Sequence, residues 1–291
     1  MKPQARLAYF DLIAFVSVLL LFPLYIQAEG IAVEEIVERL LASEARMYAA
    51  LEDISVETES IEHKLNGDGS VKEEKRFNKV VYLKANPDPD SARIMLVYER
   101  YLNFSKDGQG QNEKVLQGEI NAKLDKLKKG RSQDRSRPLT DVFLEKYNEF
   151  YTIEYLGLLD STISGYKCYH LKVRAKTGGN DLKKRIDADF YIDTISFRPV
   201  FVTFKPAKFK SNLMFKLKEM YMELLYANYG EDIWLPKRFY LKGKAKAGLF
   251  FTIRFSVTEN YSPPSFNTGL PVELFEEKIG LRGPEEIDNE K

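Results

Sequence analysis

The spacing of apolar residues changes its period after Leu51, and this change is what most constrains the fold. Residues 32–51 place apolar side chains three and four positions apart, with acidic residues early and Arg46 late, which predicts an amphipathic helix. Residues 54–65 and 70–85 then alternate with a period of two. The intervening "NGDG" predicts a tight hairpin, because both dipeptides accept positive φ. One helix followed by an antiparallel meander is therefore expected.

The alternating pattern continues through most of the chain. A third strand is expected over residues 92–105, after the two prolines of "NPDPD". Further strands are predicted over residues 151–160, 166–176, 187–194, 198–205, 218–229, 234–243 and 249–261. Turn signals separate these strands without helices between them, which favours one long antiparallel sheet, and a sheet of that length curls. The predicted fold class is α+β, with a curled antiparallel sheet forming an incomplete (half) β-barrel covered by helices.

Residues 106–137 interrupt the strands with a segment of different composition. The segment has no aromatic residue, few apolar residues, and acidic residues interleaved with its lysines and arginines. We interpret it as a solvated insertion with some helix, rather than as a membrane or nucleic-acid patch. Residues 138–150 predict a second short helix, with Pro138 at its start and Thr140 as a plausible cap.

The N-terminus has the pattern of an export signal. Lys2 and Arg6 precede the apolar run Leu12–Ile26, and the small residue Ala28 follows it. This pattern predicts a signal peptide over residues 1–28, cleaved near Ala28, and hence a periplasmic protein. The alternative is an uncleaved membrane anchor. Pro23 and the shortness of the run make that alternative the weaker one.

The sequence shows little catalytic chemistry. Its 44 basic and 43 acidic residues are balanced, so no basic field marks a nucleic-acid partner. His63 and His170 lack metal-ligand spacing, and neither a G-x-S-x-G motif nor a glycine-rich phosphate loop occurs. Cys168 and His170 lie two residues apart, and we interpret them as a buried cysteine beside an exposed imidazole rather than as a nucleophile and its base. No catalytic residue, metal or cofactor is predicted.

The strongest candidate for binding is apolar surface on two late strands. In "MYMELLY" one face carries two methionines, a leucine and a tyrosine, and a following strand offers a similar aromatic face. The candidate cavity residues are Met220, Met222, Leu224, Tyr226, Phe251, Ile253 and Phe255. Methionine-rich and aromatic concavities adapt to irregular apolar ligands such as acyl chains. The alternative is that helices and loops simply cover these strands.

Three motifs together resemble the periplasmic outer-membrane lipoprotein-sorting proteins, the LolA/LolB-like superfamily. The stretch "FYIDTISFRPVFVTF" is similar to a strand–turn–strand of that family. Its matching residues are Tyr191, Ile192, Asp193, Thr194, Phe197, Pro199 and Val200. The stretch "YGEDIWLPKRFYL" is similar to the next hairpin, through Trp234 and Pro236, and "FNTGLPVELFE" is similar to the closing segment. With the signal peptide and first helix, the resemblance covers most of Glu29–Glu277.

The resemblance implies a function without a reaction or a cofactor. It implies a half-barrel domain over residues 29–277, after which residues 278–291 are expected to be a disordered tail. It further implies a non-enzymatic carrier or chaperone that binds acyl chains of lipoproteins or lipids, with transient membrane contact and possible envelope protein partners. The alternative is an envelope regulatory or scaffold protein of the same fold that binds a protein partner. The insertion 106–137 departs from the small carriers of the family.

Overall fold

The computed structural model describes residues 31–85, 95–130, 138–176, 185–209, 215–230, 233–247, 251–276, 279–281 and 283–284. The chain divides into two units, Met1–Ala32 and Val33–Lys291, and the described helices and strands all belong to the second. The predicted signal peptide lies outside the described residues.

The elements follow the order expected from the sequence. The helices are α2 (Val33–Ala50) and α3 (Glu113–Gly130), with short 3-10 helices η2 (Leu139–Phe143), η3 (Glu145–Tyr147) and η5 (Val272–Phe275). The first strands are β1 (Asp53–Leu65), β2 (Val71–Ala85), β3 (Met95–Lys106), β4 (Gln109–Gly110), β5 (Tyr151–Leu158), β6 (Cys168–Ala175) and β7 (Ile186–Asp193). The remaining strands are β8 (Pro199–Pro206), β9 (Phe215–Asn228), β10 (Trp234–Ala247), β11 (Phe251–Tyr261), β12 (Ser265–Phe266) and β13 (Ile279–Gly280).

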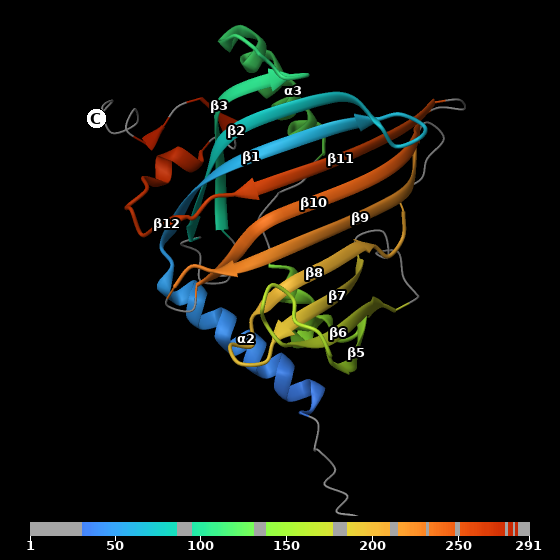
Figure 1. The fold of residues 1–291 in the computed structure, drawn as a ribbon. Coiled ribbons are helices and arrows are strands. Elements are labelled where there is room, and N and C mark those ends of the chain that lie inside the picture. Colours follow the sequence, from blue (N-terminus) through green and yellow to red (C-terminus); the bar gives the residue numbers. More distant parts are fainter. Residues whose placement is uncertain are drawn as a thin grey trace, which may run out of the picture. The chain divides into compact units, whose positions relative to one another are not determined.

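The strands form one 13-stranded sheet in the order β13-β3-β2-β1-β11-β10-β9-β8-β7-β6-β5, with β12 on β1 and β4 on β3 (Figure 1). Its pairs are antiparallel except for β13 with β3, which is parallel. The sheet does not close on itself, because β13 and β5 stand at opposite ends of the order. The prediction of a long, open antiparallel sheet is therefore confirmed. In the part of the chain that the structure describes, no helix has both the length and the apolar character to cross a membrane.

The hairpin between β1 and β2 forms where "NGDG" predicts it. The backbone N–H of Asn66 donates to the carbonyl of Ser70 at 2.9 Å, and Gly69 has a φ of +92°. The Asp68 carboxylate accepts from both the N–H and the hydroxyl of Ser70. A glycine at the positive φ avoids the strain that a side chain would meet there, so the turn fixes the β1–β2 register.

Helix α2 contacts both the first strands and the turn after β7. Met47 at its C-terminal end packs in a buried cluster with Ile54 of β1 and Met95 of β3. Near its middle, the Ser43 hydroxyl is 3.2 Å from the carbonyl of Phe197, to which it donates. The apolar stripe predicted over residues 32–51 thus lies against the sheet, as the period of the helix requires.

The family-like motifs hold turns and chain ends in place. The Asp193 carboxylate accepts from the N–H of Ser196 at 2.8 Å and from its hydroxyl at 2.7 Å, as expected of an aspartate in a turn. The register between β7 and β8 shifts where Ile192 faces Pro199, so this proline begins a bulged strand.

The closing segment is fixed by one buried carboxylate. Asp53 accepts from the backbone N–H groups of Thr268, Gly269 and Leu270. Burial raises the pKa of Asp53, but these hydrogen bonds outweigh it and hold the pKa below its usual value. The segment after β12 is therefore anchored at the start of β1.

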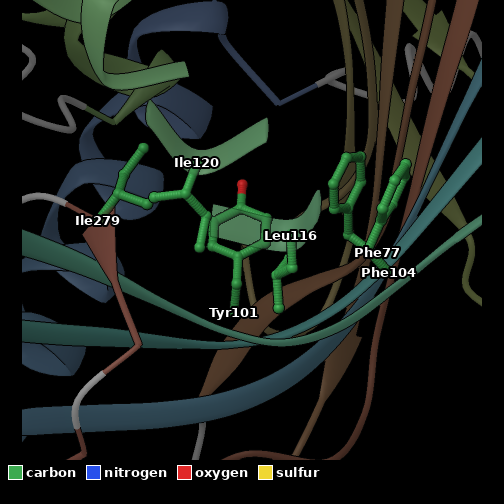
Figure 2. Close-up of a cluster of buried hydrophobic side chains, with 6 residues drawn as sticks. All are labelled: Phe77, Tyr101, Phe104, Leu116, Ile120 and Ile279. Carbon is green, nitrogen blue, oxygen red and sulfur yellow. The ribbon is translucent and has the colours of Figure 1, made fainter. Parts of the chain in front are cut away.

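The structure confirms a helix within the insertion 106–137, but the expectation that the insertion is solvated is wrong for α3. Leu116 and Ile120 of α3 are buried against Phe77 of β2 and Tyr101 of β3 (Figure 2). Two apolar residues four positions apart lie on one face of a helix, and here they suffice to pack α3 on the sheet. Residues 131–137 lie outside the described residues.

Two further elements differ in detail from the prediction. Residues 138–150 form the 3-10 helices η2 and η3, and η2 has no side-chain cap. The Thr140 hydroxyl bonds to Glu44 of α2 at 2.6 Å, so the threonine ties two elements together instead of capping one. Strand β13 lies within the residues expected to form a tail and pairs with β3. Residues 285–291 lie outside the described residues.

Candidate functional site

A pocket of about 720 Å³ lies on one face of the strands β3, β2, β1, β11 and β10. The pairing register explains why one set of alternate residues lines it. Ile54, Leu83 and Val97 face one another across β1, β2 and β3, and Val56, Val81 and Glu99 form the next row. Directly opposed residues share a face of an antiparallel sheet, so these rows form a continuous floor. The volume falls within the range of small-molecule sites.

The floor of the pocket is apolar toward one end of β1 and charged toward the other. The apolar lining residues are Ile54, Val56, Val81, Leu83, Val97, Leu235, Pro236, Val257, Pro264 and Ile279. The polar lining residues are Ser60, Glu62, Lys79, Glu99, Tyr101, Lys123, Glu259, Tyr261 and Ser262. An amphiphile, with one apolar and one polar part, matches such a division.

Lys79 of β2 is at the centre of the charged end, and its side chain is only 4% exposed. Its ammonium lies 2.7 Å from Glu99 of β3 and 2.8 Å from Glu259 of β11. The Tyr101 hydroxyl donates to Glu99 at 2.9 Å, and the Tyr261 hydroxyl donates to Glu259 at 2.7 Å. A buried charge is tolerated only when it is paired and hydrogen-bonded, and this cluster satisfies both conditions.

The electrostatic balance of the cluster keeps Lys79 and Glu259 charged and its two phenols neutral. Burial alone lowers the pKa of Lys79, but Glu99 and Glu259 outweigh burial and hold this pKa well above the usual value. Burial raises the pKa of Glu259, yet Lys79 and the Tyr261 hydroxyl bring it below the usual value. Burial and the adjacent carboxylates raise the pKa of both tyrosines.

Helix α3 contributes one wall of the pocket. The Lys123 ammonium lies 2.7 Å from Glu62 of β1 and 4.2 Å from the ring centroid of Phe77. The same ammonium is 5.5 Å from the centroid of Tyr101, so it also makes cation–π contacts. The position of Lys123 depends on the buried packing of Leu116 and Ile120 (Figure 2), so the insertion forms part of the site.

The residues predicted for the cavity lie on the same face of the sheet, beyond the pocket lining. Met222 faces Leu241, which faces the lining residue Val257, and Leu224 faces Phe239, which faces Glu259. The seven candidates Met220, Met222, Leu224, Tyr226, Phe251, Ile253 and Phe255 are not among the residues that line the pocket. Their role in binding stays a prediction.

The seven candidates also differ among themselves in exposure. Met222 is 9% exposed, whereas Phe251 and Ile253 are 73% and 39% exposed. Tyr226 packs beside Trp234 in a separate cluster, and burial raises the pKa of its hydroxyl. The Phe255 ring lies against Gly243 and leaves no room there for a Cβ.

Sequence reasoning missed the charged end of the pocket. Lys79 precedes "VVYL" in the apolar middle of a strand, and an ammonium at such a place signals a buried ion pair. Its partners Glu99 and Glu259 lie far from it in the sequence and could be found only through the register.

The structure confirms the buried cysteine, but the expectation of an exposed imidazole is wrong, because the side chain of His170 is only 18% exposed. Cys168 is buried, and burial together with Asp193 raises the pKa of its thiol to about 11, so the thiol stays protonated at neutral pH. His170 is 3.0 Å from Asp189. Within the described part of the chain, His, Cys, Asp and Glu do not gather into a group of three that could hold a metal ion.

One other row of side chains has the residue types of a hydrolytic triad. His63 lies 2.9 Å from Glu74 and 3.5 Å from the hydroxyl of Ser256. Ser256 is buried, and it lies on the face opposite the pocket, because its neighbour Val257 lines the pocket. Ser256 therefore cannot act on a ligand in the pocket, and this row of side chains does not indicate a hydrolytic reaction. The row is a cross-strand contact of β2, β1 and β11.

Comparison with known proteins gives solved structures only. No family model matches, and no curated protein matches. An outer membrane lipoprotein-sorting protein domain from Vibrio parahaemolyticus is 16% identical, with a TM-score of 0.36, over 82% of this chain and 95% of that one. A DUF1329 family protein from Desulfovibrio piger is 12% identical, with a TM-score of 0.38, over 84% and 97%. A LolA superfamily protein from Nitrosomonas europaea is 11% identical, with a TM-score of 0.33, over 83% and 97%.

Two of these descriptions name the family that the sequence motifs resemble. At such identities and TM-scores, the likeness carries no argument about what this chain binds. The pocket and its own side chains therefore indicate what this chain can bind.

Proposed function

We propose that the protein is a non-enzymatic carrier or chaperone that binds acyl chains of lipoproteins or lipids. The observation that supports this function is the 720 Å³ pocket, whose floor is a run of valine, leucine and isoleucine side chains. Transfer of an alkyl chain from water to such a surface gains roughly 0.8 kcal/mol per buried CH₂ group. The proposed place of action is the periplasm, after removal of the predicted signal peptide, residues 1–28.

A direct test is titration with a neutral long-chain probe, pyrene-labelled dodecanol. Val97 lines the pocket, and its neighbour Leu96 projects to the other face of β3. We expect Val97→Trp to fill the pocket and to weaken binding by about tenfold or more, which corresponds to roughly 1.4 kcal/mol.

The matched variant Leu96→Trp adds the same ring on the opposite face and should leave the affinity of the probe unchanged. Thermal melts of both variants separate loss of binding from loss of folding. Absence of probe binding by the unaltered protein would refute the proposed function. Equal affinities of the two variants would instead place the binding site elsewhere, and Met222→Glu then tests the stripe predicted from the sequence.

A further inference from the structure

The charged end of the pocket carries an uneven number of charges. Glu62, Glu99 and Glu259 supply three carboxylates, and Lys79 and Lys123 supply two ammonium groups. Among the described ionic side chains that line the pocket, one negative charge is therefore left over. This imbalance makes the proposed function more specific, because an apolar floor alone would accept any acyl chain, whatever its head group.

Most hydrogen-bond donors of the cluster around Lys79 are engaged by its own carboxylates. Tyr101 and Tyr261 each donate their hydroxyl proton to a glutamate, and Lys79 donates to both glutamates. A carboxylate has about four lone-pair sites, so Glu99 and Glu259 keep acceptor capacity beyond the two bonds that each makes. The charged end thus offers a ligand more acceptors than donors.

The sign of the leftover charge decides which head group fits. An anionic head group would bring a further negative charge next to half-buried carboxylates, where repulsion is stronger than between charges in open water. A cationic head group would neutralise the leftover charge and use the spare acceptors. Charge-assisted hydrogen bonds between ammonium and carboxylate are about twice as strong as neutral ones.

We infer that the pocket selects amphiphiles that carry a cationic amine beside the alkyl chain. The alkyl chain lies along the apolar rows from Ile54 to Val81, and the amine lies near Glu259 and Glu62. This inference rests on the proposed function, because it names the class of ligand for the same pocket. The shared chemistry is an ammonium group on an acyl or alkyl chain, and both a lipid head group and a lipoprotein amino terminus can supply it.

The first experiment compares three ligands that share one chain length: dodecylamine, dodecanol and dodecanoate. Displacement of the pyrene-labelled dodecanol, below the micelle concentration of each ligand, gives their relative affinities. At neutral pH we expect dodecylamine to bind about tenfold more tightly than dodecanoate, with dodecanol between them. Equal affinities of the three, or tightest binding of dodecanoate, would overturn the inference while leaving the proposed function standing.

Glu62 and Lys123 provide a matched pair of variants. They form one ion pair at 2.7 Å, and their side chains are 34% and 23% exposed, so Glu62→Gln and Lys123→Gln lose the same contact. The two variants change the charge of the pocket in opposite directions. We expect Glu62→Gln to lower the ratio of amine to carboxylate affinity by about threefold, and Lys123→Gln to raise it by about threefold. A shift of both ratios in the same direction would contradict the inference, because it would trace the effect to the lost ion pair.

A second pair of ligands distinguishes the two sources of the amine. Lysophosphatidylethanolamine tests a lipid source, and a lipidated peptide with a free amino terminus tests a lipoprotein source. Each is compared with its N-acetylated form, which keeps the chain and removes the positive charge. Weaker binding after acetylation of either ligand supports the inference and identifies that source. No change in either comparison would overturn it.

Discussion

Two regions on the same face of the sheet differ in what covers them. Over β6, β7 and β8, Leu171, Phe190 and Val202 are fully buried, and Phe143 of η2 packs against Phe190 with ring centroids 4.8 Å apart. Over β3, β2, β1 and β11, the same face carries a 720 Å³ pocket and the cluster around Lys79.

The register shows that these regions are continuous. Leu224 of β9 faces Val202 on one side and Phe239 on the other, and Phe239 faces Glu259. Alternation with period two therefore produces both a closed core and an open pocket. The difference arises from packing, because η2 closes one region, whereas α3 stands at the wall of the other and brings an ammonium group rather than an aromatic ring. The following changes test this comparison.

The largest expected effect is in the closed region. Phe190→Ala removes a buried ring that packs on Phe143. We expect the free energy of unfolding to fall by about 4 kcal/mol, through lost burial and the cavity left behind. The matched change in the pocket, Val81→Ala, should cost less than about 1.5 kcal/mol, because the half-buried valine already faces open space. Urea denaturation measures both, and equal losses would show that the pocket behaves as core.

The second effect concerns the charged end of the pocket. Lys79→Met leaves the half-buried Glu99 and Glu259 without their cation, and we expect the free energy of unfolding to fall by about 3 kcal/mol at neutral pH. Burial favours the neutral form of an unpaired carboxyl, so this loss should shrink as the pH falls toward about 4.

The double variant Lys79→Met/Glu259→Gln is the control for Lys79→Met. Because it removes one of the two unpaired carboxylates, it should be more stable than Lys79→Met at neutral pH. Urea denaturation across that pH range measures all three proteins. A loss for Lys79→Met that does not depend on pH would mean that unpaired charge is not its cause.

The third effect tests the wall formed by α3. Ile120→Ala should cost about 2 kcal/mol, because Ile120 is 1% exposed and packs on Phe77 and Tyr101. It should also weaken probe binding, since Lys123 lies one turn further along the same helix. The exposed Lys114→Ala is the control and should change the free energy of unfolding by less than about 0.5 kcal/mol. Similar stabilities of the two variants would restore the view of this segment as a solvated insertion.

The fourth effect, the smallest at neutral pH, is the loss of stability of the unaltered protein as the pH falls. The folded-state pKa values of Glu259 and Asp53 lie below their usual values of 4.5 and 3.8. Their contribution to stability is therefore fully present above those usual values, and it is lost as the pH falls through the lower folded-state values. We expect the urea midpoint to be unaffected by these two groups between about pH 7 and 6, and to fall below about pH 4.5. A Glu259→Gln variant should show a shallower fall, and an equally steep fall would assign the acid sensitivity to other groups.

The strands and turns could be predicted because their signals are local. Alternation located β1 and β2 to within one residue at each end, and "NGDG" fixed the turn between them. Asp193 and Pro199 have residue types that favour a turn and an edge or bulged strand, and they form a turn followed by a bulged strand. The insertion was misjudged because its average composition is polar, although Leu116 and Ile120 already had the spacing of a buried helix face.

The candidate binding residues illustrate where local patterns stop being informative. The stripe from Met220 to Tyr226 and the residues of the pocket floor share one period and one face of the sheet. The pattern alone cannot say which part of that face is covered, because coverage depends on where η2 and α3 pack. It also cannot pair Lys79 with Glu259, which lies 180 residues away.

The sequence by itself determined the α2 helix, the order of the strands along the chain, their turns and the face on which apolar side chains lie. Each of these features depends on neighbours a few residues apart. The tertiary structure alone decided where that face stays open and how its charges pair. Those features depend on the register of β2, β1 and β11, which brings distant residues together, and on the packing of α3 beside them. A buried charge is stable only with its partner in place, so the charged end of the pocket exists only once the sheet has formed.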